Sequence, residues 1–197
     1  MWTYEKRLQF PVKITKPCPK TATLIISQFG GPDGELAASM RYLSQRYSMP
    51  CKETAGLLTD IGTEELGHLE IICAMIYQLT KNLTAEQVKT AGFDAYYVDH
   101  TAAIWPQAAG GIPFNACEFQ SKGDSITDLT EDMAAEQKAR TTYDNILRLV
   151  KDHDVADPIK FLREREIVHF QRFGESVRLI QDELDCKNFY AFNPQFD

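Results

Sequence analysis

The sequence predicts an all-α fold, a four-helix bundle with a long crossover connection between its second and third helices. Four segments carry apolar residues at the three- and four-residue spacing of an α-helix. A long stretch rich in loop residues separates the second segment from the third. The pattern Glu-x-x-His occurs in the second and again in the fourth, and paired motifs of this kind hold two metal ions inside helical bundles. The 197 residues suit a single domain, residues 1–197.

The first bundle helix is predicted in two parts, residues 21–29 and residues 35–47. Between them the sequence Gly-Gly-Pro-Asp-Gly interrupts the helical pattern, because proline and glycine break helices. In the second part Leu36, Met40 and Leu43 recur at helical spacing. The helix is expected to end before the next proline.

The remaining three helices follow from longer patterns. Residues 52–80 carry a broad apolar stripe and give the strongest helical signal. Residues 81–124 form the crossover, with a short helix near its start and enough length to run from one end of a bundle to the other. The third helix is predicted over residues 125–150 and the fourth over residues 155–185, where Pro158 lies in the first turn and is tolerated.

Both termini lie outside this pattern. Residues 1–20 contain three prolines and are predicted to form an N-terminal arm. Residues 186–197 form a C-terminal tail, and we expect its aromatic side chains to dock on a surface. These side chains are Phe189, Tyr190, Phe192 and Phe196.

Composition excludes several functional classes. A net charge of −7 gives no electrostatic footprint for nucleic acid or an anionic membrane. No apolar run reaches the length of a transmembrane helix, and the N-terminal residues lack the apolar stretch of a signal peptide. The 5 cysteines are scattered and odd in number, which favours a reducing compartment over a disulfide framework. We therefore expect synthesis in the cytoplasm.

The candidate site is a set of carboxylates and imidazoles carried by all four helices. Positions three apart lie on one helical face, so the two side chains of each Glu-x-x-His can reach a common point. Carboxylate and imidazole ligands suit manganese or iron, and the lack of cysteine at these positions argues against structural zinc. The set consists of Glu35, then Glu65 with His68, then Glu136, and finally Glu166 with His169.

Glu64 is an alternative to Glu65. It lies four residues before His68, a spacing that also brings two side chains together on a helix. Glu65 is preferred because it repeats the three-residue spacing of Glu166 and His169.

Tyr42 follows Glu35 by seven residues and lies on the same helical face. Its hydroxyl could reach a metal ligand, or the ring could simply pack in the core. We place it with the catalytic candidates. His100 and His153 fall in loop or helix-end positions and are expected to be exposed.

The sequence Leu-Leu-Thr-Asp-Ile-Gly-Thr-Glu-Glu-Leu-Gly-His-Leu-Glu at residues 57–70 closely resembles the manganese catalases. The resemblance implies a ferritin-like bundle that disproportionates hydrogen peroxide to water and oxygen. The chain length and short tail resemble the spore-coat branch of that family. Further matching segments are residues 30–36, 40–43, 111–116, 133–136 and 165–169.

The same resemblance implies two manganese ions per chain, with iron as the alternative. It makes Glu65 the bridge between the ions. It assigns Glu166 an outer-shell role in proton handling, whereas geometry alone would make it a second bridge, as in di-iron relatives. The other ligands would be Glu35 and His68 for one ion and Glu136 and His169 for the other.

Some family members carry an outer-shell arginine beside the ligand of the third helix. This sequence has Ala135 at that position. Arg140 and Lys138 are the candidates to replace it, and access to the metals is expected to differ accordingly.

The resemblance also implies partners and a location. Hydrogen peroxide would be the substrate, the chain would form a homo-oligomer, a hexamer by resemblance, and it would be deposited in the spore coat with other coat proteins. Two alternatives remain open. A ferritin-like di-iron oxidase or ferroxidase would use Glu166 as a bridge, and a non-enzymatic coat or scaffold protein would keep the metal site for packing.

Overall fold

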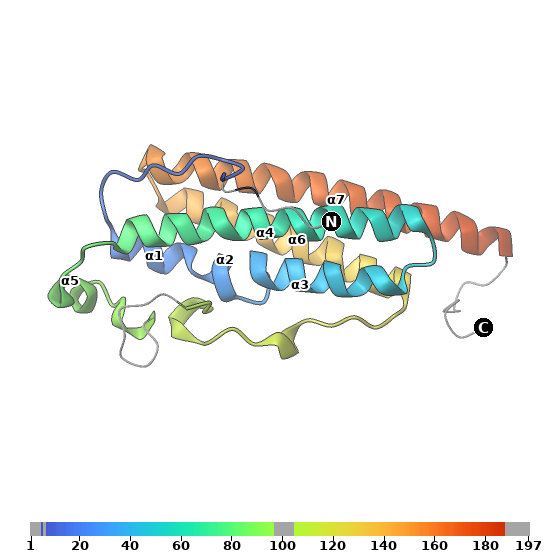
Figure 1. The fold of residues 1–197 in the computed structure, drawn as a ribbon, viewed down its shortest axis with the longest axis horizontal. Coiled ribbons are helices and arrows are strands. Elements are labelled where there is room, and N and C mark those ends of the chain that lie inside the picture. The colour runs from blue at the N-terminus through green and yellow to red at the C-terminus, as the bar shows by residue number, and fades with distance from the viewer. Residues whose placement is uncertain (1–4, 6, 97–104, 188–197) are drawn as a thin grey trace.

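The prediction of an all-α fold is confirmed by the structure, a computed structural model that describes residues 5, 7–96 and 105–187. Figure 1 shows the main helices side by side along one long axis, and the described residues contain no strand beyond an isolated bridge. Four bundle positions are filled by helices or groups of helices. They are α1 (Pro19–Ile25), α2 (Ser27–Gly30) and α3 (Glu35–Gln45) in one position, and α4 (Lys52–Thr80), α6 (Ser125–Leu149) and α7 (His153–Lys187) in the others.

The helix predicted over residues 21–29 is divided into two short helices, α1 and α2, and the glycine-rich segment separates them from α3, as predicted. In Figure 1 helices α1, α2 and α3 lie end to end beneath α4. A Cβ on Gly30 would lie 2.2 Å from the backbone nitrogen of Gln107, so the crossover passes too close for any side chain. Gln107 is buried and donates to the Tyr96 carbonyl over 2.6 Å, which fixes the crossover at this point. The glycine-rich break after α2 therefore lets the crossover segment pack directly against the backbone at Gly30.

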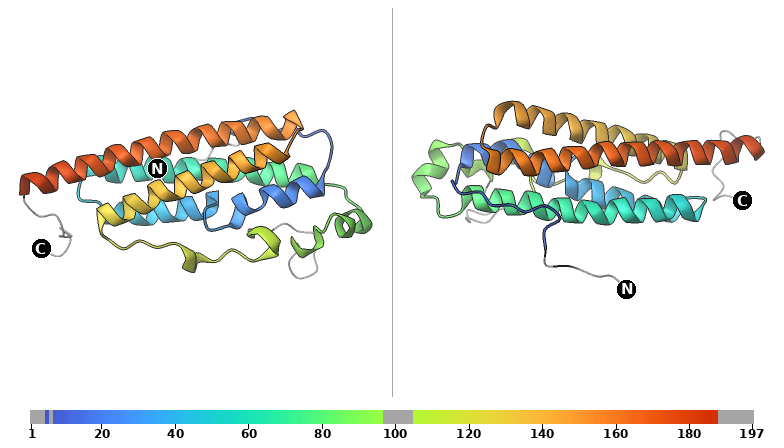
Figure 2. Two further views of the ribbon diagram at one scale, coloured as in Figure 1. Left: turned by 180° about the vertical axis from the view of Figure 1, so that it is seen from behind. Right: turned by 90° about the horizontal axis from the view of Figure 1, so that it is seen from above.

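The crossover connects two parallel helices of the bundle. Helix α5 (Ala85–Thr90) opens it, and Thr84 and Gln87 form the reciprocal hydrogen bonds of a capping box at its start. Residues 105–124 then run along the bundle toward the start of α6 (Figure 1). The left view of Figure 2 shows α6 and α7 packed side by side on the opposite face.

The fourth bundle helix starts earlier than predicted. It begins at His153, because the Asp152 carbonyl accepts hydrogen bonds from the backbone nitrogens of Val155 and Ala156 and so starts the helix. Pro158 consequently lies in the second turn instead of the first. An aspartate just before a helix is a common N-terminal signal, and Asp152 provides it here.

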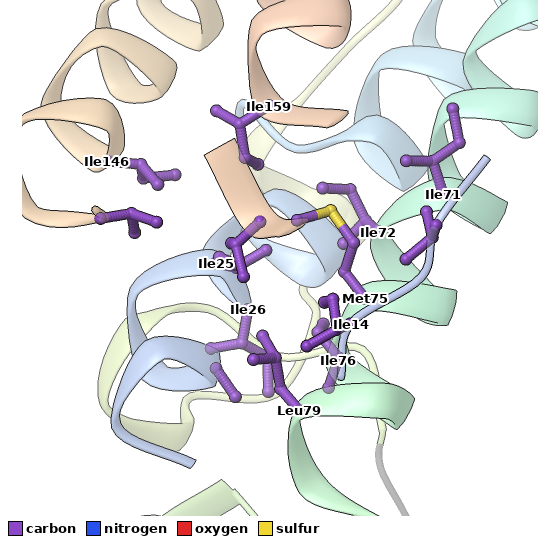
Figure 3. Close-up of a cluster of buried hydrophobic side chains, with 14 of the residues drawn as sticks. Ile14, Ile25, Ile26, Ile71, Ile72, Met75, Ile76, Leu79, Ile146 and Ile159 are labelled. Carbon is purple, nitrogen blue, oxygen red and sulfur yellow. The ribbon is translucent and has the colours of Figure 1, made fainter. Parts of the chain in front are cut away.

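Two apolar clusters fill the ends of the bundle and leave a polar band between them. Figure 3 shows the first, in which Ile72, Met75 and Ile76 of α4 pack near Ile25 and Ile159. The second cluster lies on the other side of the band. It consists of Tyr42, Leu58, Ile61, Leu129, Phe173 and Ile180. On α4 the band covers the turns between Ile61 and Ile71, where the first Glu-x-x-His lies.

Some expectations concern the ends and surface of the chain. The aromatic C-terminal tail and His100 lie outside the described residues. His153 is exposed, as expected. Within the described part of the chain, no helix has both the length and the apolar character that crossing a bilayer requires.

Candidate metal centre

Six buried side chains from four helices meet in the polar band. Two overlapping sets each bring four possible ligand atoms within 4.8 Å of one another. Glu65 and Glu166 belong to both sets, so the sets lie next to each other. All six side chains are buried, in positions where an unpaired carboxylate is strongly disfavoured. One set is Glu35, Glu65, His68 and Glu166, and the other is Glu65, Glu136, Glu166 and His169.

Glu65 lies between the two imidazoles. Its Oε2 is 2.6 Å from Nδ1 of His68, and its Oε1 is 2.8 Å from Nδ1 of His169. The same two ring nitrogens face the terminal carboxylates, at 3.8 Å from Glu35 and 3.5 Å from Glu136. Glu65 thus lies between two equivalent half-sites, each made of one histidine and one terminal carboxylate. A ligand that bridges two ions requires this position.

Glu64 binds the opposite side of both imidazoles. Its oxygens lie 3.5 Å from Nε2 of His68 and 3.1 Å from Nε2 of His169. Arg165 donates to it over 2.7 and 3.2 Å, and Gln9 donates over 3.0 Å. Burial would raise the pKa of Glu64, but the hydrogen bonds from the two histidines and Arg165 lower it well below the usual range. Glu64 is therefore an outer carboxylate that orients both histidines, as commonly found around metal sites.

Two tyrosines hold the terminal carboxylates in a crossed arrangement. Tyr42 of α3 donates to Oε1 of Glu136 on α6 over 2.5 Å, and Tyr143 of α6 donates to Oε1 of Glu35 on α3. Burial raises the pKa of both hydroxyls, so each stays protonated as a donor. Tyr42 also packs against Phe173, with ring centroids 4.9 Å apart. Tyr143 is not among the residues predicted from the sequence, although it follows Glu136 by the seven residues that separate Tyr42 from Glu35.

The two shared carboxylates have opposite electrostatic character. Burial and the negative charges of Glu136, Glu35 and Glu65 raise the pKa of Glu166 well above its usual range. Burial alone would do the same to Glu65, but the charges of His169 and His68 lower its pKa. The surroundings thus favour the protonated form of Glu166 and the anionic form of Glu65. A proton-holding group next to a charged one is a frequent feature of acid–base chemistry.

The donor set fits divalent cations. Buried oxygens of three carboxylates have no hydrogen-bond partner among the described residues, and neither does Nδ1 of His169. That nitrogen and Oε1 of Glu65 lie 2.8 Å apart without hydrogen-bond geometry, as two ligand atoms of one ion would. Unsatisfied buried acceptors are costly, and cations would satisfy them. The unpartnered oxygens belong to Glu65, Glu136 and Glu166.

The two candidates for the outer-shell arginine, Arg140 and Lys138, have partners outside the candidate ligand set. Arg140 donates to Gln137 and Asp144 along its own helix. Lys138 is 62% exposed in its side chain and lies 3.4 Å from Asp33. Neither side chain makes a hydrogen bond or ion pair with a candidate ligand among the described residues, and replacement of the arginine by one of them stays a prediction.

Comparison with known proteins gives consistent matches. The sequence model of manganese containing catalases matches residues 1–189. Protein CotJC of Bacillus subtilis (strain 168) is 52% identical over 190 residues, which cover 96% of this chain and 100% of that protein. A probable manganese catalase of Clostridium acetobutylicum is 33% identical over 191 residues, covering 96% of this chain and 85% of that one.

Solved structures with a similar fold also include a manganese catalase. The wild-type KatB crystal structure, a manganese catalase from Anabaena, superposes with a TM-score of 0.84 at 30% identity, covering 92% of this chain and 81% of that one. A dodecameric thioferritin from Bacteroides fragilis superposes with a TM-score of 0.53 at 15% identity, covering 85% of this chain and 88% of that one. This second likeness concerns the fold alone.

Proposed function

Because the chain belongs to the manganese catalase family, we propose that it is a dimanganese catalase, converting two molecules of hydrogen peroxide into two of water and one of oxygen. The observation that carries the proposal is the shared position of Glu65. Each of its oxygens faces one histidine, and a terminal carboxylate completes each side. This arrangement supports a centre for two ions held a short distance apart.

Each half-site supplies the ligands of one manganese ion. Glu35 and His68 would hold one ion, Glu136 and His169 the other, and Glu65 both. Bound there, two manganese ions would exchange two electrons with each peroxide, alternating between divalent and trivalent pairs. Tyr42 and Tyr143 keep the terminal carboxylates in place through their hydroxyl hydrogen bonds.

In the proposed reaction, Glu166 carries the protons. Reduction of peroxide to two waters consumes two protons and two electrons, and oxidation of peroxide to oxygen releases the same numbers. A group that gives and takes a proton next to the reacting oxygens therefore serves both halves of the cycle. Glu166 is buried, burial and the neighbouring carboxylates raise its pKa, and its unpartnered Oε1 is available for this exchange.

Metal content and oxygen release test the proposal together. Protein produced with manganese available should contain about two manganese ions per chain, as the bundle design requires. It should release one oxygen for every two peroxides consumed, measured with an oxygen electrode. Protein that binds zinc only, or that holds manganese and releases no oxygen, would contradict the assignment.

A di-iron oxidase or ferroxidase is the second candidate, favoured by one observation. Glu166 belongs to both ligand sets, as a second bridging carboxylate would. Aerobic addition of ferrous iron to the metal-free protein distinguishes the two. Rapid iron oxidation without peroxide disproportionation would favour the oxidase, whereas manganese-dependent oxygen release would favour the catalase.

We also propose that the protein is deposited in the spore coat as a homo-oligomer, with the hexamer as the expected size. Its 52% identity with Protein CotJC over nearly all of the chain supports this location. A coat role and catalase activity are compatible, while a scaffold that keeps the site only for packing would bind metal without activity. Extraction of purified spore coats, followed by detection of the chain and a peroxide assay, separates these cases.

Glu64→Gln should weaken manganese binding without abolishing it. The change removes the charge that orients both histidines and leaves the ligands themselves intact. Loss of such an outer partner lowers metal affinity roughly 10- to 100-fold. Competition with a chelator measures the affinity. Glu53→Gln, the same change at an exposed position of α4, is the control and should match the wild type.

A further inference from the structure

A narrow pocket leads from the surface to the candidate metal centre between α3 and α6. Pro32 and the half-buried Asp33 line its outer part, and Glu35 and Glu166 line its inner part. Its free space suits a molecule of about the size of water and excludes organic substrates. The side walls are formed by small residues, including Ala38, Ala135 and Ala139.

Arg41 is the one cationic side chain among the described residues that line this pocket. It is buried, and Phe119 lies against the guanidinium, with its ring centroid 5.9 Å from Cζ. Its Nη2 lies 3.5 Å from the Pro32 carbonyl, a weak hydrogen bond, and its charge interacts with Asp132 of α6. The Arg41 guanidinium is thus held by the Phe119 ring, the Pro32 carbonyl and the charge of Asp132.

The Nε–H of Arg41 is left without a partner. It is buried and has no hydrogen bond to any described residue. A buried donor of a charged group that remains unpaired is strongly disfavoured, so a ligand that accepts a hydrogen bond would be favoured here. Arg41 lines this pocket, so a ligand in the pocket lies next to the arginine side chain.

We propose that this pocket is the path by which peroxide reaches the metal centre, and that Nε–H of Arg41 holds an incoming peroxide oxygen beside Glu35 and Glu166. The inference rests on the proposed function. Peroxide has acceptor oxygens for Arg41 and hydroxyl donors for the carboxylates, so it matches both ends of the pocket. Arg41 is then a substrate-positioning residue, and the alanine walls limit what can follow the same path.

Arg41→Met tests the role in binding, with the full chain loaded with manganese. The substitution keeps an unbranched apolar stem and removes the donor. Peroxide KM should rise about tenfold, since hydrogen bonds from charged groups have effects of that order, while kcat changes by no more than about twofold.

Ala139→Leu should lower kcat/KM by narrowing the path from the opposite wall. Arg46→Met, a control on the same side of the chain whose guanidinium lies over Tyr47, should behave as wild type.

Azide provides a readout that does not depend on turnover. It is a linear three-atom anion with an acceptor at each end, and the shift of its infrared stretching band reports binding. Its dissociation constant should rise about tenfold in Arg41→Met and stay unchanged in Arg46→Met. Metal analysis of each variant should give the wild-type manganese content.

The outcomes separate this inference from the proposed function. An Arg41→Met protein whose KM and azide affinity stay within twofold of wild type would overturn the inference and leave the catalase assignment intact. Manganese loss in Arg41→Met alone would make the residue structural and would overturn it as well. If the wild type releases no oxygen but azide binding still depends on Arg41, the catalase assignment fails and the pocket remains a ligand path.

Discussion

Glu65→Gln is expected to lose both manganese ions and to reduce oxygen release from peroxide by at least about a thousandfold. Glu65 is the carboxylate that faces Nδ1 of both histidines, and the amide of a glutamine offers only one oxygen and no charge. The variant should therefore fail at both half-sites at once. Metal analysis after gel filtration and an oxygen electrode measure the two effects.

Two comparisons make the result specific to the site. Glu53→Gln, on an exposed turn of the same helix, should keep the wild-type metal content and activity. Circular dichroism should show that Glu65→Gln remains helical, because the two apolar clusters that flank the site are unchanged. Full activity in a folded Glu65→Gln protein would place the chemistry elsewhere in the chain.

Glu166→Gln is expected to keep its manganese but to lower kcat by about 10² to 10⁴. Burial and the neighbouring carboxylates raise the pKa of Glu166 and so favour its neutral form, which glutamine matches in shape and charge, and the change should cost little stability. Glutamine cannot release and recover a proton, so both halves of the peroxide cycle should slow. Steady-state kinetics and metal analysis of the same sample are the required measurements.

The metal content decides between the two roles considered for Glu166. Loss of one or both ions in Glu166→Gln would make Glu166 a ligand and would favour the di-iron type of centre, in which two carboxylates bridge.

Glu166→Asp is a useful companion variant, because it keeps a titratable group and displaces it by one methylene. Partial activity in Glu166→Asp together with inactivity in Glu166→Gln would support proton transfer.

The helices and the candidate ligands could be predicted because both depend on short-range spacing. Helix α4 was predicted with its observed bounds, since its apolar stripe and the proline before it leave little choice. The two Glu-x-x-His pairs need only the geometry of one helix to bring their side chains together. The start of α7 was missed by two residues, because it depends on the backbone carbonyl of Asp152.

Contacts between helices could not be predicted in the same way. The place of Glu64 behind both histidines depends on how α4 and α7 approach each other, and single-helix spacing suggested competition with Glu65 instead. Arg41 lines the pocket because small residues of α6 lie opposite, which involves distant parts of the chain. Tyr143 is an intermediate case, since the repeated seven-residue spacing from a glutamate would have indicated it.

The crossed tyrosines tie the two halves of the bundle into one unit. Each half supplies the hydroxyl that steadies the other half's terminal carboxylate, so neither helix pair contains a self-sufficient ion-binding site. A change in the relative rotation of α3 and α6 would disturb both sites together. The separation of the two half-sites is thereby set by how the two halves of the bundle dock on each other.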